Sequence, residues 1–245
     1  MAALVPKALL CLAATGLVAA GAGEPTLDEV IARHLAARGG ATRIKALQSV
    51  RMTGTASVGP GRVALVSREV KRPGRVRMEF AFQGVTAVYA WDGERGFQVS
   101  PLDGSLEPQP LSPENAELAV EQADIEGPLV DWKAKGHELE LVGRETVGDR
   151  EAFKLKLTLK SGSRRYVYLD AQSYLQVKTE TTRSFRGHEL ELETRFGDYR
   201  ETGGLQFPHS IESGARDRPR RLKVVVEKVE LNPALDDARF RTPTP

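Results

Sequence analysis

Residues 70–99, VKRPGRVRMEFAFQGVTAVYAWDGERGFQV, decide the fold class that this sequence predicts. After the corner Lys71-Arg72-Pro73, apolar and charged side chains alternate through residues 75–82, which is the pattern of a strand with one buried face. A second apolar run covers residues 85–91, and Asp92-Gly93 is a typical hairpin turn. The stretch is therefore expected to form consecutive antiparallel strands.

The large apolar side chains of these strands form the candidate wall of either a core or a ligand pocket. A packed core and a lipid pocket produce the same alternation, so the pattern by itself leaves both interpretations open. Their concentration in one stretch makes it the expected wall of whichever of the two forms. The residues concerned are Met78, Phe80, Phe82, Tyr89, Trp91 and Phe97.

The first 22 residues have the features of a secretory signal peptide. Lys7 supplies a positive charge, residues 8–20 form an apolar run, and Ala20-Gly21-Ala22 fits a cleavage site. Cys11, the only cysteine of the chain, lies in this apolar run. The mature chain, residues 23–245, would then hold no disulfide and no thiol. We expect it to be a single exported domain.

Helices are predicted in two regions of the remaining sequence, one before residue 48 and one within residues 113–136. Thr26 and Glu29 make a capping box for a first helix, and a shorter helical turn follows at about residues 41–47. Residues 101–113 contain four prolines and predict an extended surface loop. A pair of short helices, within residues 113–136, is expected to pack on the sheet.

Alternating patterns predict strands over most of the rest of the chain. The total is roughly 11–12 strands, whose apolar faces two or three small helices cannot cover, so the sheet must curl partly or fully around an apolar interior. The fold class is therefore mainly β (α+β). Strands are expected at residues 49–58, 63–71, 75–82, 85–91, 96–100, 138–147, 152–159, 164–169, 175–185, 189–199, 206–213 and 221–231.

The sequence gives no sign of catalysis, metal binding or nucleic-acid binding. Its 35 basic and 33 acidic residues leave a formal net charge of +2, whereas nucleic-acid-binding domains usually show a strong basic excess. No nucleophile elbow, phosphate-binding loop or dinucleotide fingerprint occurs. The four histidines, His34, His137, His188 and His209, lack metal-ligand spacing. We therefore expect a non-enzymatic protein with no cofactor and no metal.

Short motifs in a fixed order give the chain a resemblance to a known family. They are Val70–Pro73 (V-K-R-P), Asp92-Gly93 followed by Phe97 and Pro101, Glu126–Asp131 (E-G-P-L-V-D), Tyr168-Leu169-Asp170, Gly197–Arg200 (G-D-Y-R), Phe207-Pro208, Asn232, Leu235-Asp236-Asp237 and Phe240. In this order they resemble the LolA/LolB-type outer-membrane lipoprotein-sorting proteins. The resemblance covers nearly the whole mature chain, which is longer than a typical LolA.

The resemblance implies a strongly curved, incomplete antiparallel β-barrel with short helices as a lid over an apolar cavity. It implies a periplasmic carrier that takes lipidated protein or lipid cargo toward the outer membrane, with a transient inner- or outer-membrane partner. Leu129 and Trp132 are the expected lid contribution to the cavity. Arg72 takes the place of the arginine tied to lid closure and cargo release in LolA. A monomer is expected.

The sequence leaves three points open. The alternative function is that of an envelope sensor or interaction module with the same fold, like RseB. In such a protein the core would be filled or would serve another purpose. Arg72 could also be a surface arginine before a bend fixed by proline. A basic cluster, Arg216, Arg218, Arg220, Arg221 and Lys223, could contact anionic headgroups or a membrane partner, or could be a solvated hairpin loop.

Overall fold

The computed structural model describes residues 23–57, 61–101, 104–185, 188–216, 218 and 222–243. The predicted signal peptide lies outside these residues, as do Arg220 and Arg221 of the basic cluster. Of the described members of that cluster, Arg216 pairs with Glu191 and Lys223 pairs with Glu212 at the surface. None of the described helices is long and apolar enough to cross a membrane.

The described residues form a single 13-stranded sheet in which all neighbouring strands are antiparallel. The strand order is β6-β5-β4-β3-β2-β1-β13-β12-β11-β10-β9-β8-β7, so β6 and β7 are its two edges. The strands are β1 (Ser49–Ser57), β2 (Val63–Lys71), β3 (Arg75–Phe82), β4 (Val85–Trp91), β5 (Gly96–Ser100), β6 (Ser105–Pro110), β7 (Glu138–Val147), β8 (Arg150–Thr158), β9 (Arg164–Asp170), β10 (Gln176–Phe185), β11 (His188–Thr202), β12 (Leu205–Ala215) and β13 (Leu222–Leu231).

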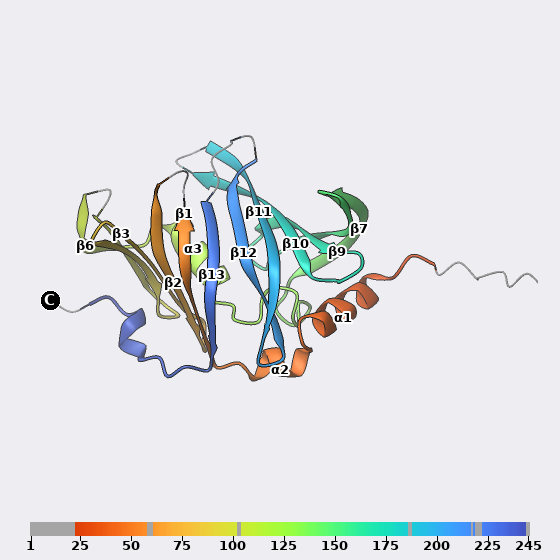
Figure 1. The fold of residues 1–245 in the computed structure, drawn as a ribbon, viewed down its shortest axis with the longest axis horizontal. Coiled ribbons are helices and arrows are strands. Elements are labelled where there is room, and N and C mark those ends of the chain that lie inside the picture. Colours follow the sequence, from red (N-terminus) through yellow and green to blue (C-terminus); the bar gives the residue numbers. More distant parts are fainter. Residues whose placement is uncertain are drawn as a thin grey trace, which may run out of the picture.

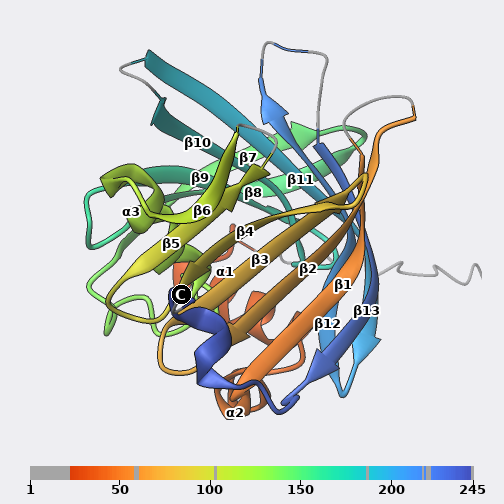
Figure 2. The same cartoon turned by 90° about the vertical axis from the view of Figure 1, so that its left-hand side faces the viewer.

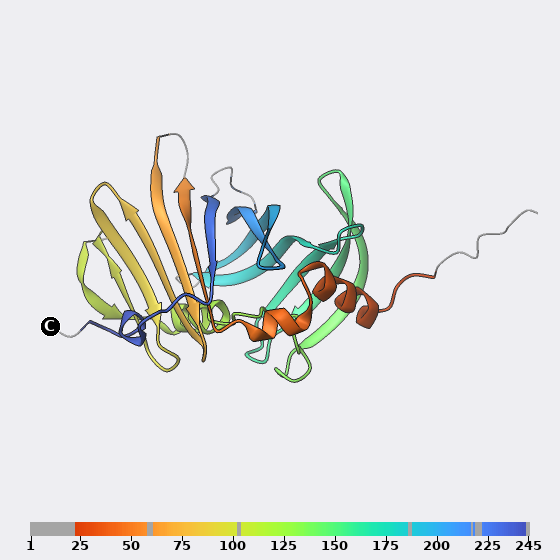
Figure 3. The ribbon, with the colours of Figure 1, turned by 60° about the horizontal axis from the view of Figure 1, so that its bottom comes forward.

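The sheet curves strongly and leaves its two edges unpaired with each other, which confirms the predicted mainly-β, incomplete-barrel fold class (Figures 1 and 3). The strand count exceeds the predicted one because part of the proline-rich stretch is not a loop. Ser105–Pro110 forms the edge strand β6, which pairs with β5. An edge strand tolerates proline because one side of its backbone makes no ladder hydrogen bonds.

Three helices lie against the sheet: α1 (Leu27–Ala37), α2 (Ala41–Ala46) and α3 (Pro113–Gln122). The predicted capping box at the start of α1 is confirmed, because Thr26 and Glu29 bond reciprocally. Figures 1 and 2 show α1 and α2 along one end of the strands, with α3 apart from them.

The second of the two short helices predicted within residues 113–136 does not form. Residues 123–137, here called the crossing segment, connect α3 to β7 through turns. Gly127 and Asp131 in this segment have positive φ angles of 85° and 48°, which an α-helix does not accommodate.

The core of the protein consists of three clusters on the inner face of the sheet. The α1 residues Val30 and Ile31 pack on β8 and β9, and the α2 residue Ile44 packs on β1 and β12. The α3 residues pack on β2 and β3. The crossing segment supplies side chains to all three clusters, through Ala123, Ile125, Leu129, Val130 and Trp132. It is therefore the element that connects the three packing regions.

Candidate functional site

The predicted aromatic wall lies partly together on the inner face of the sheet. In the β3–β4 register, Met78 pairs with Tyr89 and Val76 pairs with Trp91, so these side chains share one face. Met78, Tyr89 and Trp91 pack against the cluster that contains Ala119 of α3. Here the predicted wall is in contact with a helix.

Phe80 and Phe82 continue the same row of β3 and are half-buried. Phe97 does not join the row. It pairs with Ala90, whose side chain points to the opposite face from Tyr89 and Trp91. Phe97 is only 2 % exposed, and the adjoining strands β3 and β4 contact the C-terminal 3-10 helix η2 (Asp237–Phe240). Phe97 is thus buried on the outer side of the sheet.

The two residues predicted from the crossing segment have different positions. Leu129 is 3 % exposed and lies in the cluster under α1, and it also lines a cavity. Trp132 packs at the margin of that cluster and is half-buried, with the Lys133 ammonium 4.9 Å from its ring centre. Only Leu129 of the eight predicted wall residues borders the cavity.

The cavity has a volume of about 210 Å³ and lies between the crossing segment and the middle of the sheet. Strands β1, β2, β11 and β12 form its apolar side, with Val50, Met52, Val70, Phe196 and Phe207. The polar groups come from His34, Arg38, Arg68, Asp124 and Tyr199. This volume is below the roughly 300–1,000 Å³ of pockets that hold drug-sized ligands. A long acyl chain needs more space than this cavity provides.

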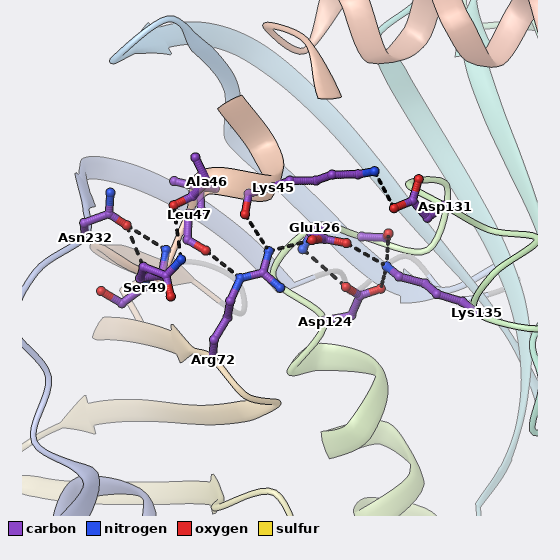
Figure 4. Close-up of polar contacts among 12 residues, drawn as sticks. Lys45, Ala46, Leu47, Ser49, Arg72, Asp124, Glu126, Asp131, Lys135 and Asn232 are labelled. Carbon is purple, nitrogen blue, oxygen red and sulfur yellow. Dashed lines mark hydrogen bonds and ion pairs between the residues drawn. The ribbon is translucent and has the colours of Figure 1, made fainter. Parts of the chain in front are cut away.

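Arg72, at the corner between β2 and β3, contacts two segments that border this region (Figure 4). Its Nε donates to the carbonyl oxygen of Leu47 at 2.6 Å, and its Nη2 donates to that of Lys45 at 3.2 Å. The same Nη2 lies 2.5 Å from Oε1 of Glu126 in the crossing segment. One guanidinium therefore joins the sheet, the end of α2 and the crossing segment, with the fixed fork of donors that arginine provides.

Further ion pairs hold the crossing segment in this position. Lys135 donates to Asp124 at 2.6 Å, and its Nζ is 3.5 Å from the second carboxylate oxygen of Glu126. Lys45 of α2 lies 2.5 Å from Asp131, with both side chains about half exposed (Figure 4). The exposed pair contributes little to stability, whereas Glu126 is mostly buried, so its contacts carry more of the energy.

The C-terminal end of α3 is attached to both halves of the sheet. Glu121 accepts from Arg165 of β9 at 2.5 Å and also pairs with Arg183 of β10. On the other side, Arg68 of β2 donates to the carbonyl oxygen of Gln122 at 2.7 Å. A cation at a helix C-terminus is favourable because the unpaired carbonyl groups there carry partial negative charge.

The surroundings change the pKa of His34, which lines the cavity, and of Glu121 at the end of α3. Burial lowers the pKa of His34 to about 4, although its hydrogen bond with the Tyr174 carbonyl, Nδ1 to O at 2.8 Å, favours the charged form. Burial alone raises the pKa of Glu121, but the hydrogen bonds and charges of Arg183 and Arg165 outweigh it and hold the pKa below its usual value. At neutral pH the imidazole is therefore neutral and the carboxylate is ionised.

Glu126, Arg38 and Arg68 belong to the site but were not predicted from the sequence. Glu126 begins the E-G-P-L-V-D motif, but its pairing with Arg72 spans 54 residues of sequence and has no local signal. The described residues contain no group of three or more His, Cys, Asp or Glu side chains that could hold a metal ion.

Comparisons with known proteins identify the fold. No family model matches the chain, and no curated protein matches it in sequence. Solved structures do match. A LolA superfamily protein from Nitrosomonas europaea has a TM-score of 0.54 and 15 % identity over 85 % of this chain and 96 % of its own. A domain from Vibrio parahaemolyticus, described as an outer membrane lipoprotein-sorting protein domain, has a TM-score of 0.50 and 14 % identity over 86 % and 94 %.

A DUF1329 family protein from Desulfovibrio piger also matches, with a TM-score of 0.52 and 12 % identity over 87 % of this chain and 96 % of its own. The alignments therefore extend over most of each chain. Identities this low establish shared architecture and nothing finer. The chain has a LolA-like fold.

Proposed function

We propose that this protein is a non-enzymatic periplasmic carrier that holds the acyl chains of lipoproteins or lipids for transfer toward the outer membrane. In this proposal residues 1–22 are a cleaved signal peptide and residues 23–245 act as one monomeric domain. The observation that carries the proposal is the position of the crossing segment, which closes a partly apolar cavity and is held by the Arg72–Glu126 ion pair. The LolA-like fold supports it.

The crossing segment is proposed to act as the lid. The closed cavity is too small for an acyl chain, so cargo must displace residues such as Leu129, whose side chain both lines the cavity and packs in the core. The hydrocarbon then replaces the lid's apolar contacts, at about 0.8 kcal/mol for each buried CH₂ group. Because closure and cargo compete for the same face, binding is reversible. The predicted row Met78, Phe80 and Phe82 would extend the wall of the open form.

The proposal can be tested by fixing the lid. Lys45 and Asp131 are exposed and adjacent, so cysteines at these positions can be joined by a reductant-cleavable bis-maleimide without changing Arg72. We expect the cross-linked protein to lose binding of a fluorescent acyl probe and to regain it after reduction. The single-cysteine variants treated with the same reagent are the controls. Cross-linked protein that binds the probe as well as the reduced protein does would contradict the proposal that the crossing segment acts as a lid.

A second candidate function is an envelope interaction module whose interior is filled. The observation that favours it is that helices and the crossing segment already occupy much of the inner face through three packed clusters. This candidate predicts that the unmodified protein, freed of lipid, binds no acyl probe at micromolar concentration. The carrier predicts saturable binding, so the same titration separates the two.

A further inference from the structure

Two guanidinium groups face the cavity without a carboxylate partner. Arg68 reaches it from β2 and Arg38 from the end of α1. Their hydrogen bonds go to backbone carbonyl oxygens, Arg68 to Gln122 at 2.7 Å and Arg38 to Glu126 at 2.9 Å. No carboxylate of the described part of the chain forms an ion pair within 4.0 Å with either of them. Neither guanidinium therefore has a direct ionic partner, but the charge of Asp124 acts on Arg38, whereas none acts on Arg68.

Arg68 lacks more of its polar partners than Arg38 does. Its Nε is buried and has no hydrogen-bond partner among the described residues. Burial lowers the pKa of Arg68 to about 10, so the group still carries its charge at neutral pH. Arg68 as a whole is half-buried, and the part of its guanidinium that has lost hydration has no ionic replacement, which is unfavourable. The position is thus prepared for an anion.

The one acid in the cavity wall does not meet this need. The carboxylate of Asp124 is bonded to Lys135 at 2.6 Å, and its charge favours the charged form of Arg38 but does not act on Arg68. His34 is neutral at physiological pH and adds no charge. The cavity therefore has a cationic side, formed by Arg38 and Arg68, and an apolar side.

We propose that this cavity binds the anionic head of an amphiphile, a carboxylate or a phosphate, between Arg38 and Arg68. The inference rests on the proposed carrier function, because the chain attached to the head can enter only when the crossing segment moves. The hydrocarbon then lies along Val50, Met52 and Phe207 on the apolar side. Guanidinium groups suit this role because their planar donors match carboxylate and phosphate oxygens.

A purely structural role for Arg68 makes a different prediction. Its bond to the Gln122 carbonyl fixes the end of α3, and that role requires a donor but no ligand. In that case replacing Arg68 would change stability without changing which ligands bind. Ligand selectivity is therefore the informative readout.

The experiment measures displacement of a neutral fluorescent apolar probe by three ligands with equal chains: dodecanoate, dodecyl phosphate and dodecanol. We expect at least one anionic ligand to displace the probe at a concentration about tenfold lower than dodecanol does. This ratio corresponds to the free energy that about one charge-assisted hydrogen bond contributes to binding. The stronger of the two anions identifies the head as a carboxylate or a phosphate. Inorganic phosphate that raises the Tm as much as dodecyl phosphate does would overturn the assignment to an amphiphile.

The variants test the residues. We expect Arg68→Met to remove the preference for anions, Arg38→Gln to reduce it, and Arg68→Lys, which keeps the charge, to retain most of it. Arg95→Gln is the control, because Arg95 is exposed in the turn between β4 and β5. Circular dichroism and Tm establish that each variant is folded.

The outcomes separate this inference from the function on which it rests. If the unmodified protein binds the probe but dodecanol and both anions displace it equally, the anionic-head inference is overturned and the carrier proposal stands. The same holds if Arg68→Met, folded, keeps the full preference. If the protein binds no probe and none of the ligands, both proposals fail.

Discussion

Arg72 Nη2 lies 2.5 Å from Glu126 Oε1, which joins the β2–β3 corner to the crossing segment 54 residues further along the chain. The same side chain bonds two carbonyl oxygens at the end of α2. Glu126 is held from its other side as well, by Arg38 at its carbonyl and by Lys135 at its carboxylate. One mostly buried carboxylate therefore links the crossing segment to both Arg72 and Lys135.

Arg72→Leu is expected to favour the open form. The change removes three donor contacts from the closed state, so the closed state competes less well with cargo. We expect affinity for an acyl probe to rise by about tenfold, the equivalent of about 1.4 kcal/mol. Native mass spectrometry of protein isolated from the periplasm should show more retained lipid. Glu126→Gln should act in the same direction. An unchanged affinity in both variants would argue that the Arg72–Glu126 ion pair does not hold the crossing segment closed.

Glu121→Gln is expected to destabilise the protein by about 3 kcal/mol, because Arg165 and Arg183 lose their shared carboxylate. Urea denaturation at pH 7 measures the loss. Glu117→Gln, on an exposed position of the same helix, is the matched control and should change stability by less than about 0.5 kcal/mol.

Glu121 should also contribute to unfolding in acid. Its pKa in the folded protein lies below the ordinary 4.5, so its stabilising contribution is present above pH 4.5 and is lost as the pH falls through the folded value. Below pH 4.5 the unfolding free energy of Glu121→Gln should therefore fall less steeply than that of the unmodified protein. Parallel curves for the two proteins would contradict this role.

His34 should make stability depend on pH in a higher window. Burial lowers its pKa from 6.5 to about 4, so folding favours the neutral imidazole and the unfolded chain binds the extra proton. Stability is complete above pH 6.5 and should fall by about 3 kcal/mol as the pH drops from 6.5 to 4. Urea titrations at several pH values measure the slope. His34→Asn should flatten it, and an identical slope in the variant would assign the effect to other groups.

Gly39→Ala is expected to be far more damaging than Gly40→Ala. Both glycines have positive φ angles, 108° and 94°, so both substitutions introduce backbone strain of about 1–2 kcal/mol. A Cβ at position 39 would also lie 2.0 Å from the carbonyl oxygen of Gly204, whereas position 40 is open. The difference in Tm between the two variants measures the clash. Equal losses would mean that the α1–α2 corner can move away from the β11–β12 hairpin.

Local sequence rules predicted the elements whose causes are local. The capping box of Thr26 and Glu29 starts α1 as expected, because all its atoms lie within one helical turn. The alternation in residues 75–82 placed Met78, Phe80 and Phe82 on one face, since successive side chains of a strand must point to opposite sides. The prediction of a second helix within residues 113–136 was wrong because Asp131 adopts a left-handed backbone conformation, with a φ of 48°, that no local sequence rule requires.

The side of the sheet to which Phe97 points depends on the register between β4 and β5. In the hairpin around Asp92-Gly93, Trp91 pairs with Gly96 and Ala90 pairs with Phe97. A shift of one residue in this pairing would have moved Phe97 to the other face. The sequence marked a turn at this point but did not define how many residues it uses.

The sequence by itself determined that this chain is mainly β, that the sheet must curl, and where most strands begin and end, because hydrophobic burial imposes a period of two on every half-buried strand. Only the tertiary structure decided which charges meet. The Arg72–Glu126 pair and the cavity charges of Arg38 and Arg68 join segments that are far apart in the chain. Such contacts leave no periodic signal, since they depend on the curvature of the sheet and on the path of the crossing segment.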